Sequence, residues 1–144
     1  MNSERELFLA TVNRHLGLPY IWGGDDSIYG LDCSGLVIEG LKTIGRLKED
    51  EDMVAHDLCY GLFKNSPSPA IHALRPGDLV FYGSPKVIHV EIVYDRIAGK
   101  VYAIGAMGGG SKTKTVEDAI KQNAYIKVRP LKVNYVMSRN IFGD

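Results

Sequence analysis

The sequence lacks the features that mark several large classes of protein. It has only 2 cysteines in 144 residues and no paired Cys/His ligand spacing, which argues against a disulfide framework and against a structural zinc site. No run of residues approaches the roughly 20 apolar residues of a membrane span. The first residues lack the basic start and apolar core of a secretory signal, so we expect synthesis in the cytoplasm and no membrane span.

An excess of charge of one sign is also absent. The 17 Lys+Arg residues equal the 17 Asp+Glu residues, so we expect no broad basic surface for binding nucleic acid. A chain of 144 residues, 45% of them hydrophobic, is long enough to bury one sizeable core. These values predict one domain over residues 1–144. They leave the oligomeric state and the class of substrate open.

Helical spacing dominates the first half of the chain, and strand spacing dominates the second. Ser3 and Glu6 form a capping-box pattern at the start of the first helix. An acidic run over residues 48–52 suggests a solvated surface and the start of another helix. The order of elements predicts an α+β fold with N-terminal helices packed on an antiparallel sheet. The expected helices cover residues 3–16, 33–44, 54–62 and 115–122, and the expected strands cover 79–82, 87–94, 101–104, 125–129 and 135–137.

Cys33 is the first candidate for a catalytic residue. It precedes apolar residues at helical spacing, which predicts that the thiol lies in or beside the first turn of a helix. The unpaired backbone N–H groups and the dipole at such a position favour an anion, and therefore the reactive thiolate. The alternative is a small buried structural cysteine. The polar neighbours Asp32 and Ser34 favour a nucleophile, whereas Cys59, on the flank of an apolar helical stripe, is expected to be structural.

His89 is the expected partner of the cysteine. His15 and His56 fall on expected helices and His72 on a loop, whereas His89 lies on a strand. Side chains two residues apart in a strand point to the same face, so His89 and Glu91 should be neighbours. A cysteine nucleophile normally needs a histidine to take its proton.

Four blocks of sequence together resemble the NlpC-type cell-wall cysteine peptidases. They are PYIWGG at residues 19–24, DCSGLV at 32–37, RPGDLVFY at 75–82 and HV at 89–90. The resemblance implies a compact papain-like fold and cleavage of stem peptides in bacterial peptidoglycan. It also implies Cys33 as nucleophile, His89 as base, Tyr20 near the oxyanion, and Asp32 and Ser34 as residues that shape the pocket for the end of the stem peptide.

Two positions depart from the pattern of that family. Glu91 stands where the family usually has glycine, and Gly105 stands where it usually has a polar residue that orients the histidine. Glu91 is long enough to lean back toward the ring of His89 and orient it. Alternatively, Glu91 points to solvent or to a substrate amine, and a backbone carbonyl or a water molecule orients His89. Both interpretations stay open at this stage.

The resulting hypothesis is a peptidoglycan hydrolase that works as a cysteine endopeptidase, with no metal and no cofactor. Its expected partners are the stem peptides, and its site residues are Cys33, His89 and Glu91 for catalysis and Tyr20, Asp32 and Ser34 for substrate. The glycine run at residues 107–111 is a candidate rim of the peptide cleft. We expect action on the cell wall after release or delivery, for example in a phage lysis or tail apparatus. The alternatives are a non-catalytic wall-binding or virion structural domain on the same fold, and a thiol acyltransferase.

Overall fold

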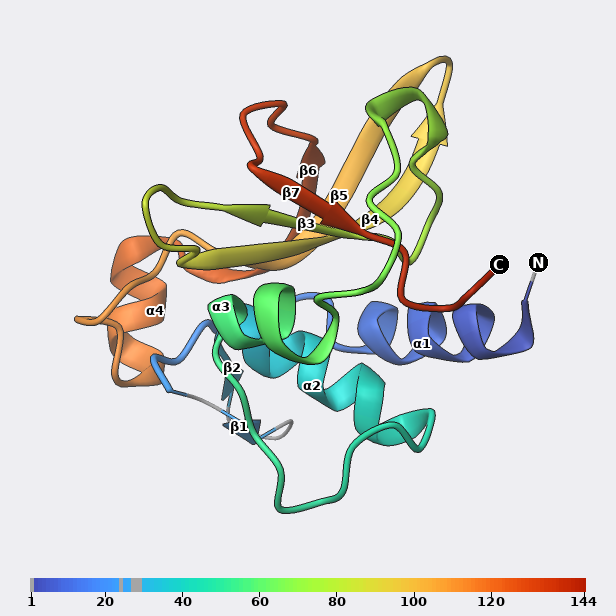
Figure 1. Cartoon of the computed structure of the whole chain (residues 1–144). Helices are drawn as coiled ribbons and strands as arrows, with labels where there is room; N and C mark the ends of the chain where they lie inside the picture. The colour runs from blue at the N-terminus through green and yellow to red at the C-terminus, as the bar shows by residue number, and fades with distance from the viewer. Residues whose placement is uncertain (1, 24, 27–29) are drawn as a thin grey trace.

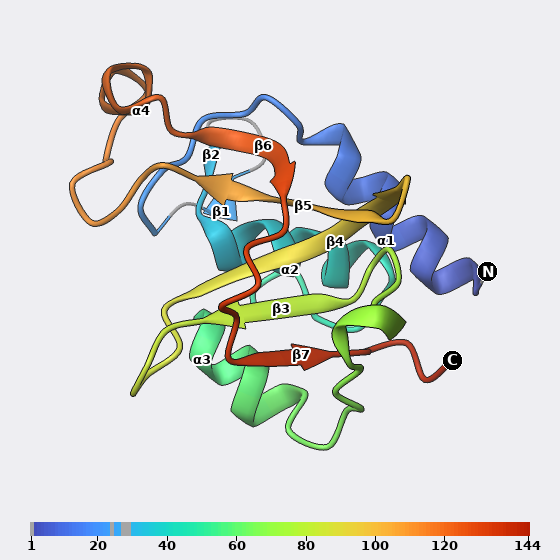
Figure 2. The same ribbon diagram turned by 90° about the horizontal axis from the view of Figure 1, so that it is seen from above.

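A five-stranded antiparallel sheet forms one layer of the molecule, and helices cover one of its faces (Figure 1). The computed structural model describes residues 2–23, 25–26 and 30–144. The strand order in the sheet is β6-β5-β4-β3-β7, which Figure 2 shows from above. The strands of this sheet are β3 (Leu79–Tyr82), β4 (His89–Ile97), β5 (Lys100–Met107), β6 (Tyr125–Pro130) and β7 (Met137–Arg139), and a separate small pair consists of β1 (Asp25–Asp26) and β2 (Gly30–Leu31). The helices are α1 (Ser3–Arg14), α2 (Cys33–Thr43), α3 (Ala55–Asp57) and α4 (Val116–Gln122), with a π-helical turn η1 (Leu58–Leu62) and a 3-10 turn η2 (Ile71–Ala73).

This architecture confirms the predicted α+β fold class. All five expected strands of the sheet are present; β3 has the expected ends, and the ends of the other four are shifted. β4 begins at His89 instead of residue 87 and continues to Ile97, with a register shift between Val93 and Asp95. β5 continues to Met107, so Gly105 lies inside a strand and the glycine loop begins only at residue 108.

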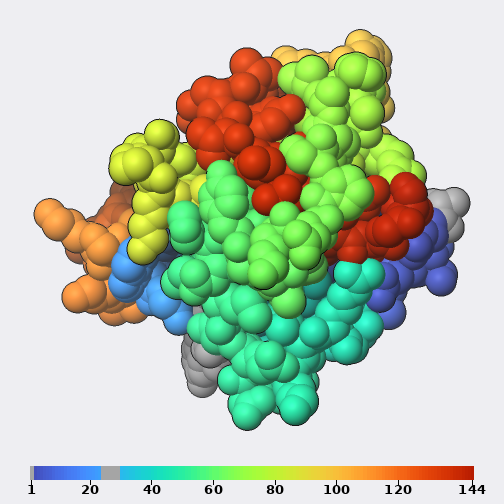
Figure 3. All heavy atoms as spheres, viewed as in Figure 1, coloured from blue at the N-terminus to red at the C-terminus, as the bar shows by residue number. Residues whose placement is uncertain are grey.

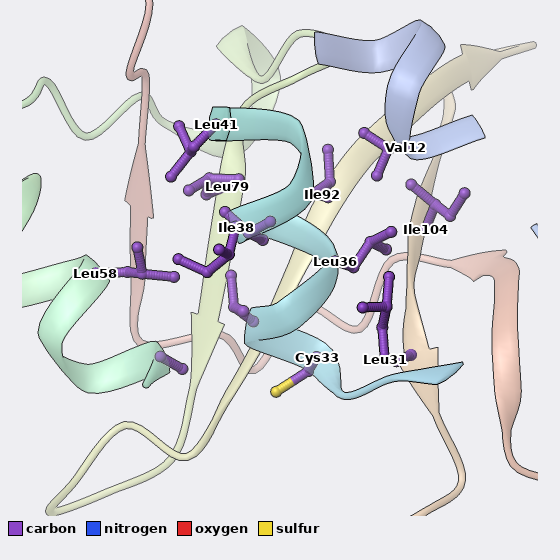
Figure 4. Close-up of a cluster of buried hydrophobic side chains, with 14 of the residues drawn as sticks. Val12, Leu31, Cys33, Leu36, Ile38, Leu41, Leu58, Leu79, Ile92 and Ile104 are labelled. Carbon is purple, nitrogen blue, oxygen red and sulfur yellow. The ribbon is translucent and has the colours of Figure 1, made fainter. Parts of the chain in front are cut away.

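The helix α2 is held by apolar residues on its buried face. Leu36, Ile38 and Leu41 are fully buried, and in Figure 4 they lie among Leu79, Ile92 and Ile104 of the sheet. α1 crosses α2 at Gly40, where an added Cβ would stand 2.5 Å from the ring of Phe8. Because helix and sheet are packed this closely, the first residue of α2 has a fixed place at the end of the core.

Two of the expected helices differ in detail from the prediction. The side chain of Asn2, and not that of Ser3, caps α1 by accepting bonds from the backbone N–H groups of Glu4 and Arg5. The helix ends at Arg14, and Leu16 is 48% exposed. The expected Ser3 capping box is therefore wrong, because the residue before it already satisfies the free N–H groups.

The segment expected as one helix over residues 54–62 is a single turn of α-helix followed by the π-turn η1. Val54 and Leu62 are exposed, whereas Leu58 and Cys59 are buried. A π-turn is wider than an α-turn, so the buried positions no longer follow steps of four. The acidic run at 48–52 lies before this helix and not in its first turn.

Arg5 fastens the two ends of the described chain to the sheet. Its guanidinium is 1% exposed, donates to the Asp78 carboxylate at 3.0 Å, and donates to the Asp144 carboxylate at 2.6 Å. Figure 3 shows the C-terminal segment, in red, lying against α1, in blue. The contacts form a buried ionic network and not a surface salt bridge.

We expect Arg5→Met to lower the free energy of unfolding by about 3–5 kcal/mol, because it leaves the buried carboxylate of Asp78 without its cation. Urea denaturation of the variant and the parent protein measures the difference. Arg75→Met is the matched control: Arg75 also bonds Asp144 but is 47% exposed, so its loss should cost less than about 1 kcal/mol. Equal losses in the two variants would contradict the assignment.

No helix among residues 2–23, 25–26 and 30–144 is long and apolar enough to cross a membrane.

Candidate active site

Cys33 is the first residue of α2, as its spacing predicted, and it is 8% exposed. The preceding residue, Asp32, caps the helix: its side chain accepts the backbone N–H of Gly35 at 2.7 Å and the Ser34 hydroxyl at 3.3 Å. Figure 4 shows the Cys33 sulfur at the end of α2, at the edge of the apolar cluster. The thiol therefore sits among the unpaired N–H groups of the first helical turn, where an anion is favoured.

His89 opens β4 beside this helix start. Its Nε2 lies 2.8 Å from a carboxylate oxygen of Glu91. Burial lowers the pKa of His89. Hydrogen bonds with Cys33 and Glu91, together with the charges of these groups, outweigh burial and raise the pKa to about 9. Because Glu91 occupies Nε2, the other ring nitrogen, Nδ1, is left for the thiol. The site thus favours the imidazolium form of His89.

The Glu91 side chain has no exposed surface, and two cationic groups compensate for its burial. Burial raises the pKa of Glu91, but hydrogen bonds from His89 and Arg129 and their charges lower it below its usual value. Arg129, on β6, donates through Nε at 3.3 Å and through a second, shorter bond from its terminal nitrogen. The Glu91 carboxylate therefore points at His89 and not at solvent, which is the first of the two interpretations left open by the sequence.

Gly105 provides the space that Glu91 occupies. It lies on β5, between β4 and β6, and a Cβ added there would stand 3.1 Å from Cγ of Glu91. That separation is closer than ordinary van der Waals contact, so a side chain at position 105 would push Glu91 away. The two departures from the family pattern are therefore spatially complementary, because a glycine and a polar residue have exchanged places across adjacent strands.

Tyr20 closes another side of the candidate site. It is 6% exposed, and its pKa is raised by burial first and then by the charges of Cys33 and Asp32, which places the phenol close to both. Gly109 of the glycine loop lies against the ring: an added Cβ would stand 2.3 Å from it. The loop after β5 is thus packed onto a residue of the site, as expected for a rim.

Comparison with known proteins identifies the family. A model of the NlpC/P60 family matches residues 17–139 of the chain. The chain belongs to the NlpC/P60 family. It is 32% identical over 82 residues to the probable endopeptidase YafL of Escherichia coli K12; the match covers 57% of this chain and 31% of YafL. The chain thus spans about a third of the length of this curated relative.

Solved NlpC/P60 structures share the fold. The peptidoglycan hydrolase RipB from Mycobacterium tuberculosis superimposes with a TM-score of 0.70 at 21% identity, over 97% of this chain and 65% of that one. RipD from the same organism, described as a non-catalytic NlpC/p60 domain protein adapted to peptidoglycan binding, gives a TM-score of 0.62 at 15% identity, over 96% and 97% of the two chains. At these identities the likeness establishes the fold alone.

The other three histidines and the second cysteine have contacts outside the candidate site. Nδ1 of His15 is 2.7 Å from the carbonyl oxygen of Thr11, and His72 lies on η2 beside a cavity of about 380 Å³ formed with residues such as Lys100 and Leu131. Nδ1 of His56 accepts the backbone N–H of Val87 at 3.3 Å. Cys59 is fully buried, and burial raises its pKa, as expected for a structural cysteine.

Arg129 is the residue that sequence reasoning missed. A buried glutamate between the apolar residues Val90 and Ile92 requires a cation, and this was the available signal. The identity of the cation depends on the strand order, which brings β6 within reach of β4 across Gly105. Gly24, the last residue of the PYIWGG block, and residues 27–29 lie outside the described residues. Within the described ranges, no group of three or more His, Cys, Asp or Glu side chains is arranged to hold a metal ion.

Proposed function

We propose that this protein is a peptidoglycan hydrolase, a cysteine endopeptidase that cleaves a peptide bond in the stem peptides of the cell wall. The observation that carries the proposal is a chain of contacts: Cys33, at the start of α2, contacts His89, and His89 contacts Glu91. Such an order is that of a nucleophile, a base and an orienting group. The names of YafL, a probable endopeptidase, and RipB, a peptidoglycan hydrolase, support the same reaction and substrate.

In the proposed reaction each group has a role. The Cys33 thiolate attacks the carbonyl carbon and forms a C–S bond, and the backbone N–H groups at the start of α2 and the nearby Tyr20 stabilise the oxyanion. The His89 imidazolium gives its proton to the leaving amine as the C–N bond breaks. His89 then takes a proton from a water molecule, whose oxygen attacks the thioester and releases Cys33. Asp32 and Ser34 lie beside the nucleophile, where they would contact the end of the bound stem peptide.

Incubation with purified peptidoglycan tests the proposal. We expect soluble fragments whose masses, read by mass spectrometry, show one peptide bond replaced by the elements of water. Binding without any fragment would support the competing function, a non-catalytic wall-binding domain, which the likeness in fold to RipD favours. Fragments carrying an added amine in place of water would identify a thiol acyltransferase instead.

The pH dependence of turnover should change when Glu91 becomes glutamine. In the parent protein the imidazolium of His89 is kept up to a pH of about 9, so turnover should fall above that pH. Cys33 and Glu91 both raise this pKa, and Glu91→Gln removes the contribution of the carboxylate. The alkaline limb should therefore move down in pH, toward the ordinary value of about 6.5, and turnover at the optimum should fall by about tenfold or more. A pH profile of fragment release measures both changes.

The same ionisation affects stability with a defined sign. Because the pKa of His89 is higher in the folded state, the stabilisation from its protonation is fully present below about pH 6.5 and is lost as the pH rises through about 9.

Glu117→Gln, on the exposed surface of α4, is the matched control for Glu91→Gln and should leave the pH profile of fragment release unchanged. An alkaline limb that stays in place in Glu91→Gln would show that another group holds the imidazolium.

A further inference from the structure

We propose that Arg129 is a positioning residue that holds the carboxylate of Glu91 against Nε2 of His89, in the space left by Gly105. The proposal deepens the proposed function and rests on it for the role of the Cys33 and His89 pair. It adds Arg129, on a strand two positions away from β4 in the sheet, to the residues that control the protonation of that pair.

The contacts of Arg129 fix the direction of the Glu91 side chain. Both oxygens of the carboxylate receive bonds from the guanidinium, and one of them, Oε2, also lies 2.8 Å from His89. A planar guanidinium that bonds both oxygens restricts the rotation of a carboxylate as well as its position. Without it, Glu91 would be a buried anion with His89 as its single partner, and its carboxylate could rotate away from Nε2.

The charges around Glu91 show what the removal of Arg129 would do. The titratable groups that face Glu91 are His89 of its own strand, Arg129 of β6 and Tyr82 of β3, whereas β5 presents only Gly105. His89 is faced by Cys33 of α2 and by Glu91, and the ring of Tyr82 lies 5.8 Å from its own. Arg129 is thus the one permanent cation among the described groups that bond Glu91, and its loss favours the protonated carboxylic acid.

When Glu91 is protonated or displaced, the imidazolium form of His89 is less stable, and the thiolate form of Cys33 is less stable in turn. The effect of Arg129 on the thiol is indirect, so it should be visible in the reactivity of the thiol without any peptidoglycan being cleaved. Alkylation by iodoacetamide reports the thiolate fraction directly. The pH at which the alkylation rate reaches half its plateau belongs to the coupled pair and not to either residue alone.

The test measures this half-plateau pH for the full chain and its variants, with peptide mapping to separate Cys33 from Cys59. We expect Arg129→Met to raise the half-plateau pH by about one unit, so that alkylation below the midpoint is about tenfold slower. Arg129→Lys should raise the half-plateau pH less. Lys127→Met is the matched control, since Lys127 lies two residues away on the same strand and bonds only the backbone oxygen of Asn123 in the described structure. An unchanged midpoint in a folded Arg129→Met protein would overturn the proposal.

The double variant Glu91→Gln with Arg129→Met keeps the test decisive if Arg129→Met does not fold, because it leaves no unpaired buried carboxylate. If Arg129 acts through Glu91, the double variant should show the same midpoint as Glu91→Gln alone. An additional upward shift would show that Arg129 acts on the pair by another route and would contradict the proposal. Parent protein that alkylates as expected but releases no fragments from peptidoglycan would refute the proposed function and leave the role of Arg129 standing.

Discussion

Replacement of Cys33 by alanine is expected to reduce the release of peptidoglycan fragments to background, a loss of about five orders of magnitude or more. The reason is that the variant lacks the attacking sulfur, and the hydroxyl of Tyr82, whose ring lies 5.8 Å from that of His89, donates to the carbonyl oxygen of Lys132 instead. The change removes a single sulfur atom at the surface end of the core, where Cys33 is 8% exposed, so the fold should be kept. Mass spectrometry of the fragments measures activity, and circular dichroism measures folding.

Cys59→Ala is the matched control for the loss of a thiol. Cys59 is fully buried in the π-turn, so its replacement should lower stability by about 1–2 kcal/mol and keep turnover per folded molecule. Iodoacetamide should label Cys33 faster than Cys59, because Cys59 has no exposed surface and burial raises its pKa. A Cys33→Ala protein that still cleaves peptidoglycan, or equal labelling of the two cysteines, would refute the assignment of the nucleophile.

Replacement of His89 by alanine is the second large effect, an expected loss of about three to four orders of magnitude in turnover. The variant lacks the imidazolium that stabilises the thiolate and protonates the leaving amine, so only the N–H groups at the start of α2 still favour an anion at Cys33. Fragment release under single-turnover conditions measures the chemical step separately from product release. Labelling of Cys33 at neutral pH should slow in the same variant.

His15→Ala and His72→Ala are the controls for this prediction. Both histidines lie away from Cys33, one after α1 and the other on η2, so both variants should keep turnover within about twofold. His56 is a poorer control because it bonds the backbone of Val87, two residues before His89. A loss in His15→Ala or His72→Ala as large as that in His89→Ala would contradict the choice of base.

The sequence by itself determined the parts of the site that depend on local spacing. Apolar residues at steps of three and four placed Cys33 at the start of a helix, and the two-residue period of a strand placed His89 and Glu91 on one face. Both are properties of short segments whose backbone repeats regularly. The helix start and the contact between Nε2 of His89 and Glu91 are present in the structure. The strand ends moved by a few residues because neighbouring strands, and not local preference, decide where pairing stops.

Only the tertiary structure decided how the charge of Glu91 is compensated. Arg129 is 38 residues away in the chain and reaches Glu91 only because β5 lies between β4 and β6 and carries a glycine at that point. Local periodicity carries no information about strand order, so it left Glu91 with two possible directions. The resemblance to the NlpC family marked Gly105 only as the place where a polar residue is missing. A buried carboxylate requires both room and a cation. In the sheet, Gly105 of β5 leaves the room and Arg129 of β6 supplies the cation.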